Sequence, residues 1–245
     1  MALCRTCGSE CSLKYEIVTL DQSKSSWYIC KCGCIYNIDK VDVGIFGKDY
    51  KEKYMNAKSI LDRTEYLRRN YIPLIEELTY GRRFLDVGFT YPYHFEPLKQ
   101  RGWIVDGIDV MDNDYIKGNF EDYDFEYRRY DFINMGSVLE SFNEPIKALH
   151  KAYWLLNPSG VLFIQTPDTD FMYLVGMQKF GHWNNKEHTV YWSQRKLNEE
   201  LKKIGFEIVL SRKNYSQRYI CWNNQHVIVQ KSYIREKEEE EKDGI

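Results

Sequence analysis

Residues 83–110 read RFLDVGFTYPYHFEPLKQRGWIVDGIDV, and this stretch decides the fold class. Its two apolar runs, residues 84–87 and 103–110, are separated by one helix's length of chain, which is typical of a strand, a helix and a parallel strand. The first run ends in Asp86-Val87-Gly88 and the second in Asp109. Glycine lets the backbone approach a ligand, and a carboxylate after the second strand can accept hydrogen bonds from both hydroxyls of a ribose. The stretch therefore predicts a βαβ unit that binds a nucleotide-like ligand.

This pattern resembles the opening of the class I S-adenosylmethionine (SAM)-dependent methyltransferases, whose first loop usually reads D-x-G-x-G-x-G before a second strand that ends in an acid. Asp86, Gly88 and Asp109 match, whereas Thr90 and Pro92 replace the second and third glycines. Thr90 adds a Cβ atom and Pro92 lacks an N–H, although Pro92 suits the first turn of a helix. The resemblance implies a Rossmann-like α/β sheet with helices on both faces, and a SAM site formed by Asp86, Gly88, Phe89, Asp109, Val110, Asn119, Met135 and Gly136.

Two later segments continue the resemblance. Residues 130–141 are similar to the family's fourth strand and its following loop, with Ser141 in place of a common histidine, and residues 155–167 are similar to its run L-L-x-P-G-G-x-L-x-I-x-T-P. Asn134, Met135 and Gly136 would then lie beside the methionine end of the cofactor. Asn119 occupies the place of an aspartate that accepts from the adenine amino group. Its carbonyl oxygen can accept the same bond, and a plain turn asparagine is the alternative.

An aromatic segment follows the last of these runs, from residue 168 to residue 191, and contains His182, Trp183, Glu187 and His188. A loop in this place lies at the carboxyl edge of the sheet, where open α/β folds bind ligands. His188 is the candidate general base or substrate contact, because the ordinary pKa of histidine is about 6.5. Glu187 is the candidate that orients it or binds a hydroxyl. The alternative is a histidine that packs against aromatic side chains ahead of a helix capped by Ser193.

Six of the seven cysteines lie in the first 34 residues, paired around glycines. Two cysteine turns facing each other can hold a tetrahedral zinc ion, and so small a unit needs such support. The favoured ligands of this structural zinc ribbon are Cys4, Cys7, Cys30 and Cys32, with Cys34 as a substitute and Cys11 as a spare. The ribbon is expected to pack on the following domain or to shape a substrate entrance.

The chain of 245 residues is therefore expected to divide into four parts. Residues 1–40 form the zinc ribbon, 41–80 a linker and helical lead-in, 81–234 the methyltransferase-like domain, and 235–245 a charged, disordered tail. The 34 basic and 36 acidic residues nearly balance, so no global field attracts nucleic acid or membrane. No apolar run approaches the ~20 residues of a membrane span. We expect a cytoplasmic protein.

The leading functional hypothesis is SAM-dependent methyl transfer to a small polar acceptor. A ribbon ending in Cys-Gly with a tyrosine-rich segment after it, at residues 49–54, is similar to zinc-ribbon methyltransferases of sugar and surface-glycan modification, which implies a nucleotide-linked sugar or a glycan. Nucleic acid stays open as an acceptor, because zinc ribbons and aromatic loops also stack bases. The alternative from another class is a methyltransferase-like scaffold that no longer catalyses, or a protein whose working part is the ribbon. The oligomeric state is open.

Overall fold

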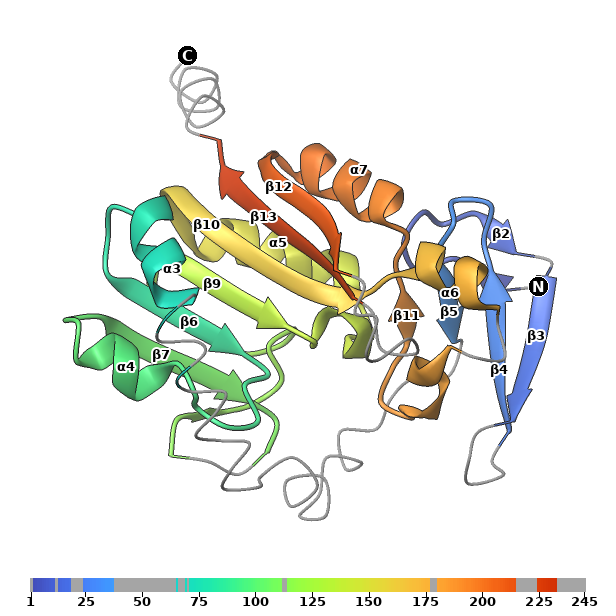
Figure 1. Cartoon of the computed structure of the whole chain (residues 1–245), viewed down its shortest axis with the longest axis horizontal. Coiled ribbons are helices and arrows are strands. Elements are labelled where there is room, and N and C mark those ends of the chain that lie inside the picture. Colours follow the sequence, from blue (N-terminus) through green and yellow to red (C-terminus); the bar gives the residue numbers. More distant parts are fainter. Residues whose placement is uncertain are drawn as a thin grey trace.

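The computed structural model describes residues 2–11, 13–18, 24–37, 65, 69, 71–111, 114–176, 180–214 and 224–232. It contains a large sheet with a smaller one beside it (Figure 1). Residues 41–64 of the expected linker, the seventh cysteine, Cys221, and the expected tail at 235–245 lie outside these residues. Within the described part, every helix is too short or too polar to cross a membrane.

The large sheet has seven strands in the order β12-β13-β10-β9-β6-β7-β8. Its centre is parallel and consists of β6 (Arg83–Val87), β7 (Ile104–Asp109), β9 (Tyr130–Gly136) and β10 (Leu156–Pro167). An antiparallel hairpin closes one edge, formed by β12 (Phe206–Asn214) and β13 (Asn224–Lys231). The other edge is β8 (Ile116–Lys117), only two residues long, in agreement with the short stretch of chain between Asp109 and β9.

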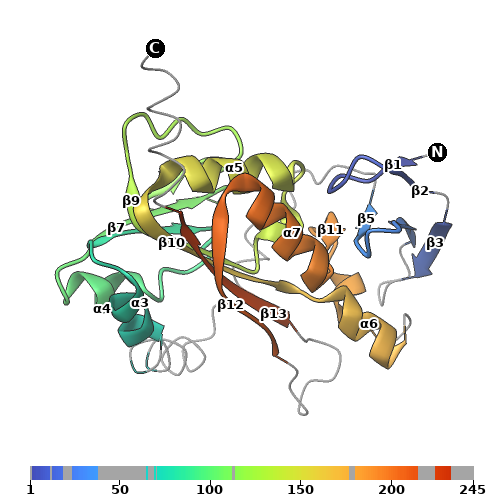
Figure 2. The same cartoon turned by 90° about the horizontal axis from the view of Figure 1, so that it is seen from above.

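Both faces of this sheet are covered because neighbouring residues of each strand are apolar and point to opposite sides. Leu85 and Ile133 belong to one buried cluster, and Phe84 and Phe132 to the other. Helices α5 (Pro145–Leu155) and α7 (Gln194–Ile204) lie on the first side, and α3 (Ile72–Leu78) and α4 (Phe95–Lys99) on the second (Figure 2). The predicted Rossmann-like sheet with helices on both faces is confirmed.

Helix ends follow local rules with one correction. Ser193 caps α7 as expected, because its Oγ accepts the N–H of Lys196 at 3.3 Å. Helix α4 begins at Phe95 and not at Pro92, since the Pro92 carbonyl first accepts the Phe95 N–H in a separate turn at 3.2 Å. Part of the expected loop after β10 is helical, as α6 (Thr169–Val175) and the short 3₁₀ helix η5 (Gly181–Asn184).

The N-terminal β region, called the ribbon below, comprises the described residues from 2 to 37. Its strands are β1 (Ala2–Leu3), β2 (Glu10–Cys11), β3 (Leu13–Val18), β4 (Lys24–Ile29) and β5 (Ile35–Asn37). The last three form a sheet whose fourth strand, β11 (Val190–Tyr191), comes from the segment between η5 and α7. The ribbon and the larger domain therefore share a sheet.

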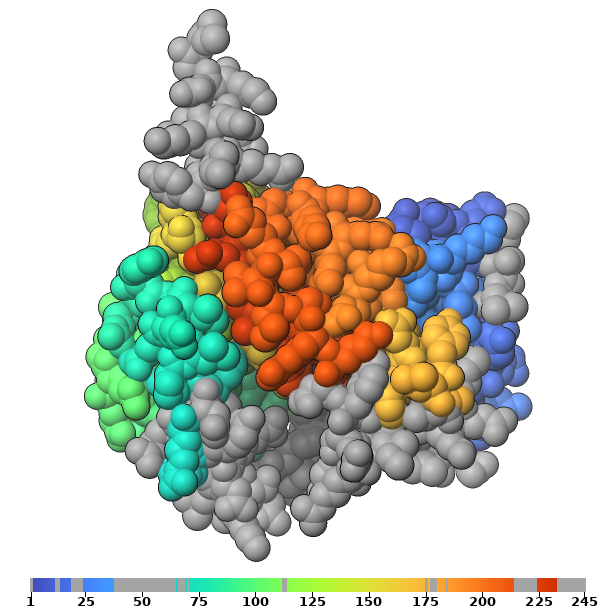
Figure 3. Space-filling view, turned by 45° about the horizontal axis from the view of Figure 1, so that its top comes forward, coloured from blue at the N-terminus to red at the C-terminus, as the bar shows by residue number. Residues whose placement is uncertain are grey.

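A third buried cluster fills the junction of the ribbon with the segment after β10. Trp27 of β4 stacks on Tyr191 at 4.8 Å and meets the edge of Trp183 at 5.0 Å between ring centroids. Ile35, Phe171, Met172 and Phe180 complete the cluster. The space-filling view shows the blue ribbon beside the yellow and orange atoms of α6 and α7 (Figure 3). Burial of several large aromatic side chains, worth about 1.5–3 kcal/mol each, holds this junction together.

Candidate functional site

A cleft opens at the carboxyl ends of β6, β7 and β9 and contains about 710 Å³ of space, counting the part open to solvent. Strand order changes direction here, because β7 lies on one side of β6 and β9 on the other. Such switch points are where open α/β sheets bind ligands. The lining comes from residues 87, 88 and 90, from residues 108–111, from the turn at 118–121, and from residues 137, 138 and 141–143. The last group is called the 137–143 wall below.

Gly88 lies where this cleft meets the end of β6. Its φ angle is +67°, and a Cβ atom added there would lie 2.5 Å from Cγ2 of Val138. Both observations require glycine, so the match to the family pattern at this position reflects a backbone conformation and a close contact with the Val138 side chain that a larger residue would not allow. Thr90 also has a positive φ angle, of +50°. A β-branched residue is strained in this conformation, which explains why glycine is the ordinary choice there.

Replacing Thr90 by glycine is expected to raise the free energy of unfolding by about 1 kcal/mol, because glycine adopts a positive φ angle without the steric cost. Thermal unfolding measures the gain as a shift of about 2–4 °C. Thr90→Ala, which keeps the Cβ atom, should give less than half of that gain. Equal stability of the two variants would contradict the strain at this position.

Asp109 ends β7 and turns its carboxylate toward the loop after β6. Its Oδ2 accepts the Thr90 N–H at 2.9 Å and its Oδ1 accepts the Met111 N–H at 2.8 Å. The residue is buried, and burial raises the pKa of its carboxyl group, with a smaller contribution from the nearby charge of Asp86. Each oxygen retains a lone pair for a further donor. The backbone bonds therefore fix a carboxylate at the cleft, ready to accept from a diol.

Asn119 lines the cleft and also forms a turn. Its Oδ1 accepts the Glu121 N–H at 3.0 Å, which is the alternative expected of a turn asparagine. Glu121 was not foreseen in the sequence: its buried carboxylate accepts the N–H groups of Asn143, at 3.3 Å, and Glu144. Glu121 thereby joins the 118–121 turn to the 137–143 wall. More than twenty residues separate these partners, so no local pattern signals the contact.

Four of the predicted cofactor residues lie behind the lining of the cleft. Asp86 is buried, and its Oδ1 accepts a hydrogen bond from Nδ2 of Asn134 at 2.6 Å. Its Oδ2 lies 3.0 Å from Nδ1 of His94. Phe89 packs between Phe95 and Tyr115. Met135 is fully buried in the core, and Gly136 directly precedes the wall. Gly88, Asp109, Val110 and Asn119 are the predicted residues that line the cleft.

His188 and Glu187 are buried beside the wall and do not line the cleft. Nδ1 of His188 lies 3.2 Å from the Tyr191 hydroxyl, and its Nε2 lies 3.9 Å from Oε1 of Glu140. Burial lowers the pKa of His188 well below its ordinary value, and the nearby His182 adds to the effect. These contacts agree with the alternative interpretation, in which the histidine packs among aromatic side chains.

Glu140 is a buried acid that the sequence did not single out. Burial raises its pKa from 4.5 to about 7, the charge of Glu187 contributes, and a hydrogen bond from the Thr166 hydroxyl at 2.9 Å opposes the rise. The folded protein thus binds this proton more tightly than the unfolded chain does. The protonated Glu140 therefore contributes its full stabilisation below the pKa of the unfolded state. This stabilisation is lost as the pH rises through the pKa of the folded state.

Glu140→Gln is expected to remove this pH dependence. The shift from 4.5 to about 7 corresponds to about 3 kcal/mol, so the variant should gain up to that amount over the wild type above neutral pH. Urea unfolding at a series of pH values measures the difference, with Glu77→Gln, an exposed substitution, as the control. Parallel pH profiles for wild type and Glu140→Gln would contradict a raised pKa.

The ribbon brings together the four favoured cysteines. The Sγ atoms of Cys4, Cys7, Cys30 and Cys32 all lie within 4.8 Å of one another, with 3.8 Å between Cys4 and Cys32 and 3.5 Å between Cys7 and Cys30. Tetrahedral zinc with Zn–S bonds of about 2.3 Å requires sulfur separations of about 3.8 Å. The cluster therefore fits zinc. Cys11 and Cys34 are buried outside it.

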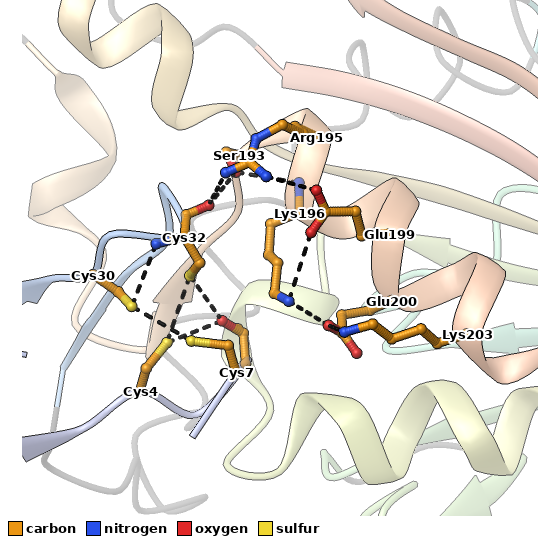
Figure 4. A network of polar contacts seen from close by, with 11 residues as sticks. Cys4, Cys7, Cys30, Cys32, Ser193, Arg195, Lys196, Glu199, Glu200 and Lys203 are labelled. Atoms are coloured by element: carbon orange, nitrogen blue, oxygen red, sulfur yellow. Dashed lines mark hydrogen bonds and ion pairs between the residues drawn. The ribbon is translucent and has the colours of Figure 1, made fainter. Parts of the chain in front are cut away.

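Hydrogen bonds from α7 fasten the second cysteine turn to the larger domain (Figure 4). The Cys32 carbonyl accepts from Oγ of Ser193 at 3.3 Å and from Nη2 of Arg195 at 3.2 Å. Lys196, buried beside the cluster, forms an ion pair with Glu200. The positions of the cysteines and of the N-terminus of α7 are thus fixed together.

Residues 60–211, more than half of the chain, match the family model described as a methyltransferase domain. None of the curated proteins matches.

Solved structures share the fold at low sequence identity. A chain in the complex between the Haloferax volcanii Trm112 methyltransferase activator and a putative methyltransferase is 13% identical, with a TM-score of 0.59 over 78% of this chain and 98% of that one. A SAM-dependent methyltransferase from Archaeoglobus fulgidus is 16% identical, with a TM-score of 0.56 over 74% of this chain and 98% of that one. The magnesium protoporphyrin IX methyltransferase of Synechocystis, solved with bound S-adenosylhomocysteine (SAH), is 12% identical, with a TM-score of 0.54 over 76% of this chain and 96% of that one.

Proposed function

The chain belongs to the methyltransferase-domain family and is a SAM-dependent methyltransferase, and from this premise we propose that its cleft transfers the methyl group to a small polar acceptor. The observation that carries the proposal is the meeting of Gly88 and Asp109 at the switch point of the sheet, within one cleft. Gly88 lets a ligand approach the backbone closely, and Asp109 presents a carboxylate that backbone hydrogen bonds hold in place.

The residues of the cleft fit SAM. Asp109 would accept the ribose hydroxyls, Val110 and Asn119 would contact the adenine, and Gly88 lines the cleft with its backbone alone. When bound, SAM supplies an electrophilic methyl group. The protein's own contribution is then to hold an acceptor in line with that group and to exclude water, so that proximity and orientation supply much of the rate.

A small polar acceptor is supported by the side chains of the 137–143 wall. Ser137, Ser141 and Asn143 bring hydroxyl and amide groups to the cleft. Among the described residues of its lining none is a lysine or an arginine, and binding of nucleic acid relies on such cations. This favours a sugar or another neutral small molecule over a nucleic acid. The sugar and glycan class is the one that the zinc-ribbon resemblance implies.

The proposal keeps His188 as a candidate base with Glu187 as its partner. Their burial and the lowered pKa of His188 favour a packing role in the resting protein. Ser141 lines the cleft at the position of the family's common histidine.

Cys4, Cys7, Cys30 and Cys32 would hold the proposed structural zinc, supported by the spacing of their sulfur atoms. Four thiolates occupy every coordination position of a tetrahedral zinc ion and leave none for a substrate. This metal would therefore stabilise the fold and take no part in catalysis.

The test of the acceptor class is direct. Purified protein is incubated with SAM and panels of nucleotide-linked sugars, free glycans and oligonucleotides, and the products are analysed by mass spectrometry. Methylation of a sugar panel member that depends on Asp109 is the expected result. Methylation confined to oligonucleotides would overturn the small-acceptor proposal.

A further inference from the structure

Thr189 forms hydrogen bonds to both the ribbon and the cleft wall. It is fully buried immediately before β11. Its carbonyl accepts the N–H of Asn37, the last residue of β5, at 2.8 Å. Its own N–H donates to the Glu140 carbonyl at 2.7 Å, and its hydroxyl donates to the Phe142 carbonyl. One residue thus connects two parts of the chain that are far apart in sequence.

The carbonyls that Thr189 binds belong to the end of a short 3₁₀ helix, η3 (Leu139–Ser141), whose C-cap is Phe142. The last carbonyls of a helical turn have no partner within it and must find one elsewhere. Ser141 ends this turn, Phe142 and Asn143 follow it, and all three line the cleft. The hydrogen bonds of Thr189 therefore fix the backbone from which these cleft side chains project.

Thr189 is itself held by the ribbon. Strand β11 has only two residues, which pair with β5 as Val190 with Tyr36 and Tyr191 with Ile35. So short a strand is stable only as part of a larger sheet. Strand β5 follows directly on the turn of Cys30 and Cys32, which α7 also grips through the Cys32 carbonyl (Figure 4). An unbroken series of backbone contacts runs from the cysteine cluster to the cleft.

We propose that Thr189 is a positioning residue of the methyltransferase site, through which the ribbon fixes the 137–143 wall. This role rests on the proposed function of the cleft. It assigns the ribbon a part in ligand binding although no cysteine of the cluster lines the cleft.

The test compares SAH binding by calorimetry in three variants of the full chain. Thr189→Val keeps the shape of the side chain and removes its hydroxyl, and Thr189→Ser restores the hydroxyl. Thr169→Val is the matched control, because Thr169 is equally buried and its hydroxyl also donates to a backbone carbonyl, in this case that of Gly33 in the ribbon, at 3.0 Å. Thr169 does not belong to the cleft lining.

Thr189→Val is expected to bind SAH about tenfold more weakly, because it loses a buried hydrogen bond to the wall, whose Val138 packs against Gly88 in the cleft. Thr189→Ser and Thr169→Val should bind like the wild type, although Thr169→Val loses comparable stability. Equal affinities in Thr189→Val and Thr169→Val would overturn the role of Thr189. Failure of the wild type to bind SAH would instead overturn the proposed function of the cleft, and this role with it.

If Thr189→Val does not fold, hydrogen exchange of the wild type with and without a zinc chelator tests whether the ribbon fixes the wall through Thr189. Removal of metal should speed the exchange of the amides of Asn37, Thr189 and Asn143, while those of Leu85 and Val87 in β6 stay protected. Unchanged exchange at Thr189 would overturn the link between the ribbon and the wall.

Discussion

Asp109→Ala is expected to weaken the binding of SAH by about a hundredfold or more. Hydrogen bonds to a charged group contribute about 1.5–3 kcal/mol each, and the carboxylate would accept two from the ribose. The substitution also leaves the N–H groups of Thr90 and Met111 without their acceptor, which loosens the loop that carries Gly88. Calorimetric titration of the wild type and the variant with SAH measures the loss.

Asp114→Ala is the control, because it removes an exposed carboxylate from the same region of the chain, outside the lining of the cleft. This variant should bind SAH like the wild type. Comparable affinities in Asp109→Ala and the wild type would place the ribose elsewhere and contradict the assignment of the cleft.

The pH dependence of binding offers a second measure of the same carboxylate. Burial raises the pKa of Asp109, so its ionised form, which accepts from the ribose, is lost at a higher pH than for an ordinary aspartate. SAH binding should therefore weaken as the pH falls through this raised pKa and should be constant above it. Affinity that rises on acidification would be incompatible with the role of Asp109.

Cys7→Ser is expected to abolish stoichiometric zinc and to lower the free energy of unfolding by at least about 4 kcal/mol. Structural zinc contributes about 10–16 kcal/mol to the folding of small domains, and loss of a metal is among the few mechanisms with effects this large. The loss arises in the ribbon and extends to the sheet it shares with β11. Metal analysis and urea unfolding measure the two effects.

Cys11→Ser provides the comparison, since Cys11 is a buried cysteine of the same ribbon that lies outside the four-sulfur cluster. It should retain its zinc and lose only the stability expected of a small change in the core. Zinc loss in Cys11→Ser together with retention in Cys7→Ser would show that a different set of cysteines holds the metal.

The sequence by itself determined the central βαβ unit, the position of the cleft and the four-cysteine cluster. These features depend on rules that act over a few residues. Consecutive apolar residues lie in β6, Gly88 occupies a backbone conformation that other residues avoid, and the cysteines stand in close pairs. The helix cap at Ser193 is of the same kind. Such features depend on residues close together in the sequence, so they can be predicted without knowing how the rest of the chain is packed.

Only the tertiary structure decided how these parts meet. The pairing of β11 with β5, the bonds of Glu121 to the wall and the burial of His188 each join residues that are far apart in sequence. Asp86 likewise matches the family pattern, yet its carboxylate is taken up by Asn134 and His94 beneath the cleft. The cause is the same throughout: burial and hydrogen-bond partners are set by packing between distant segments, which no local pattern records.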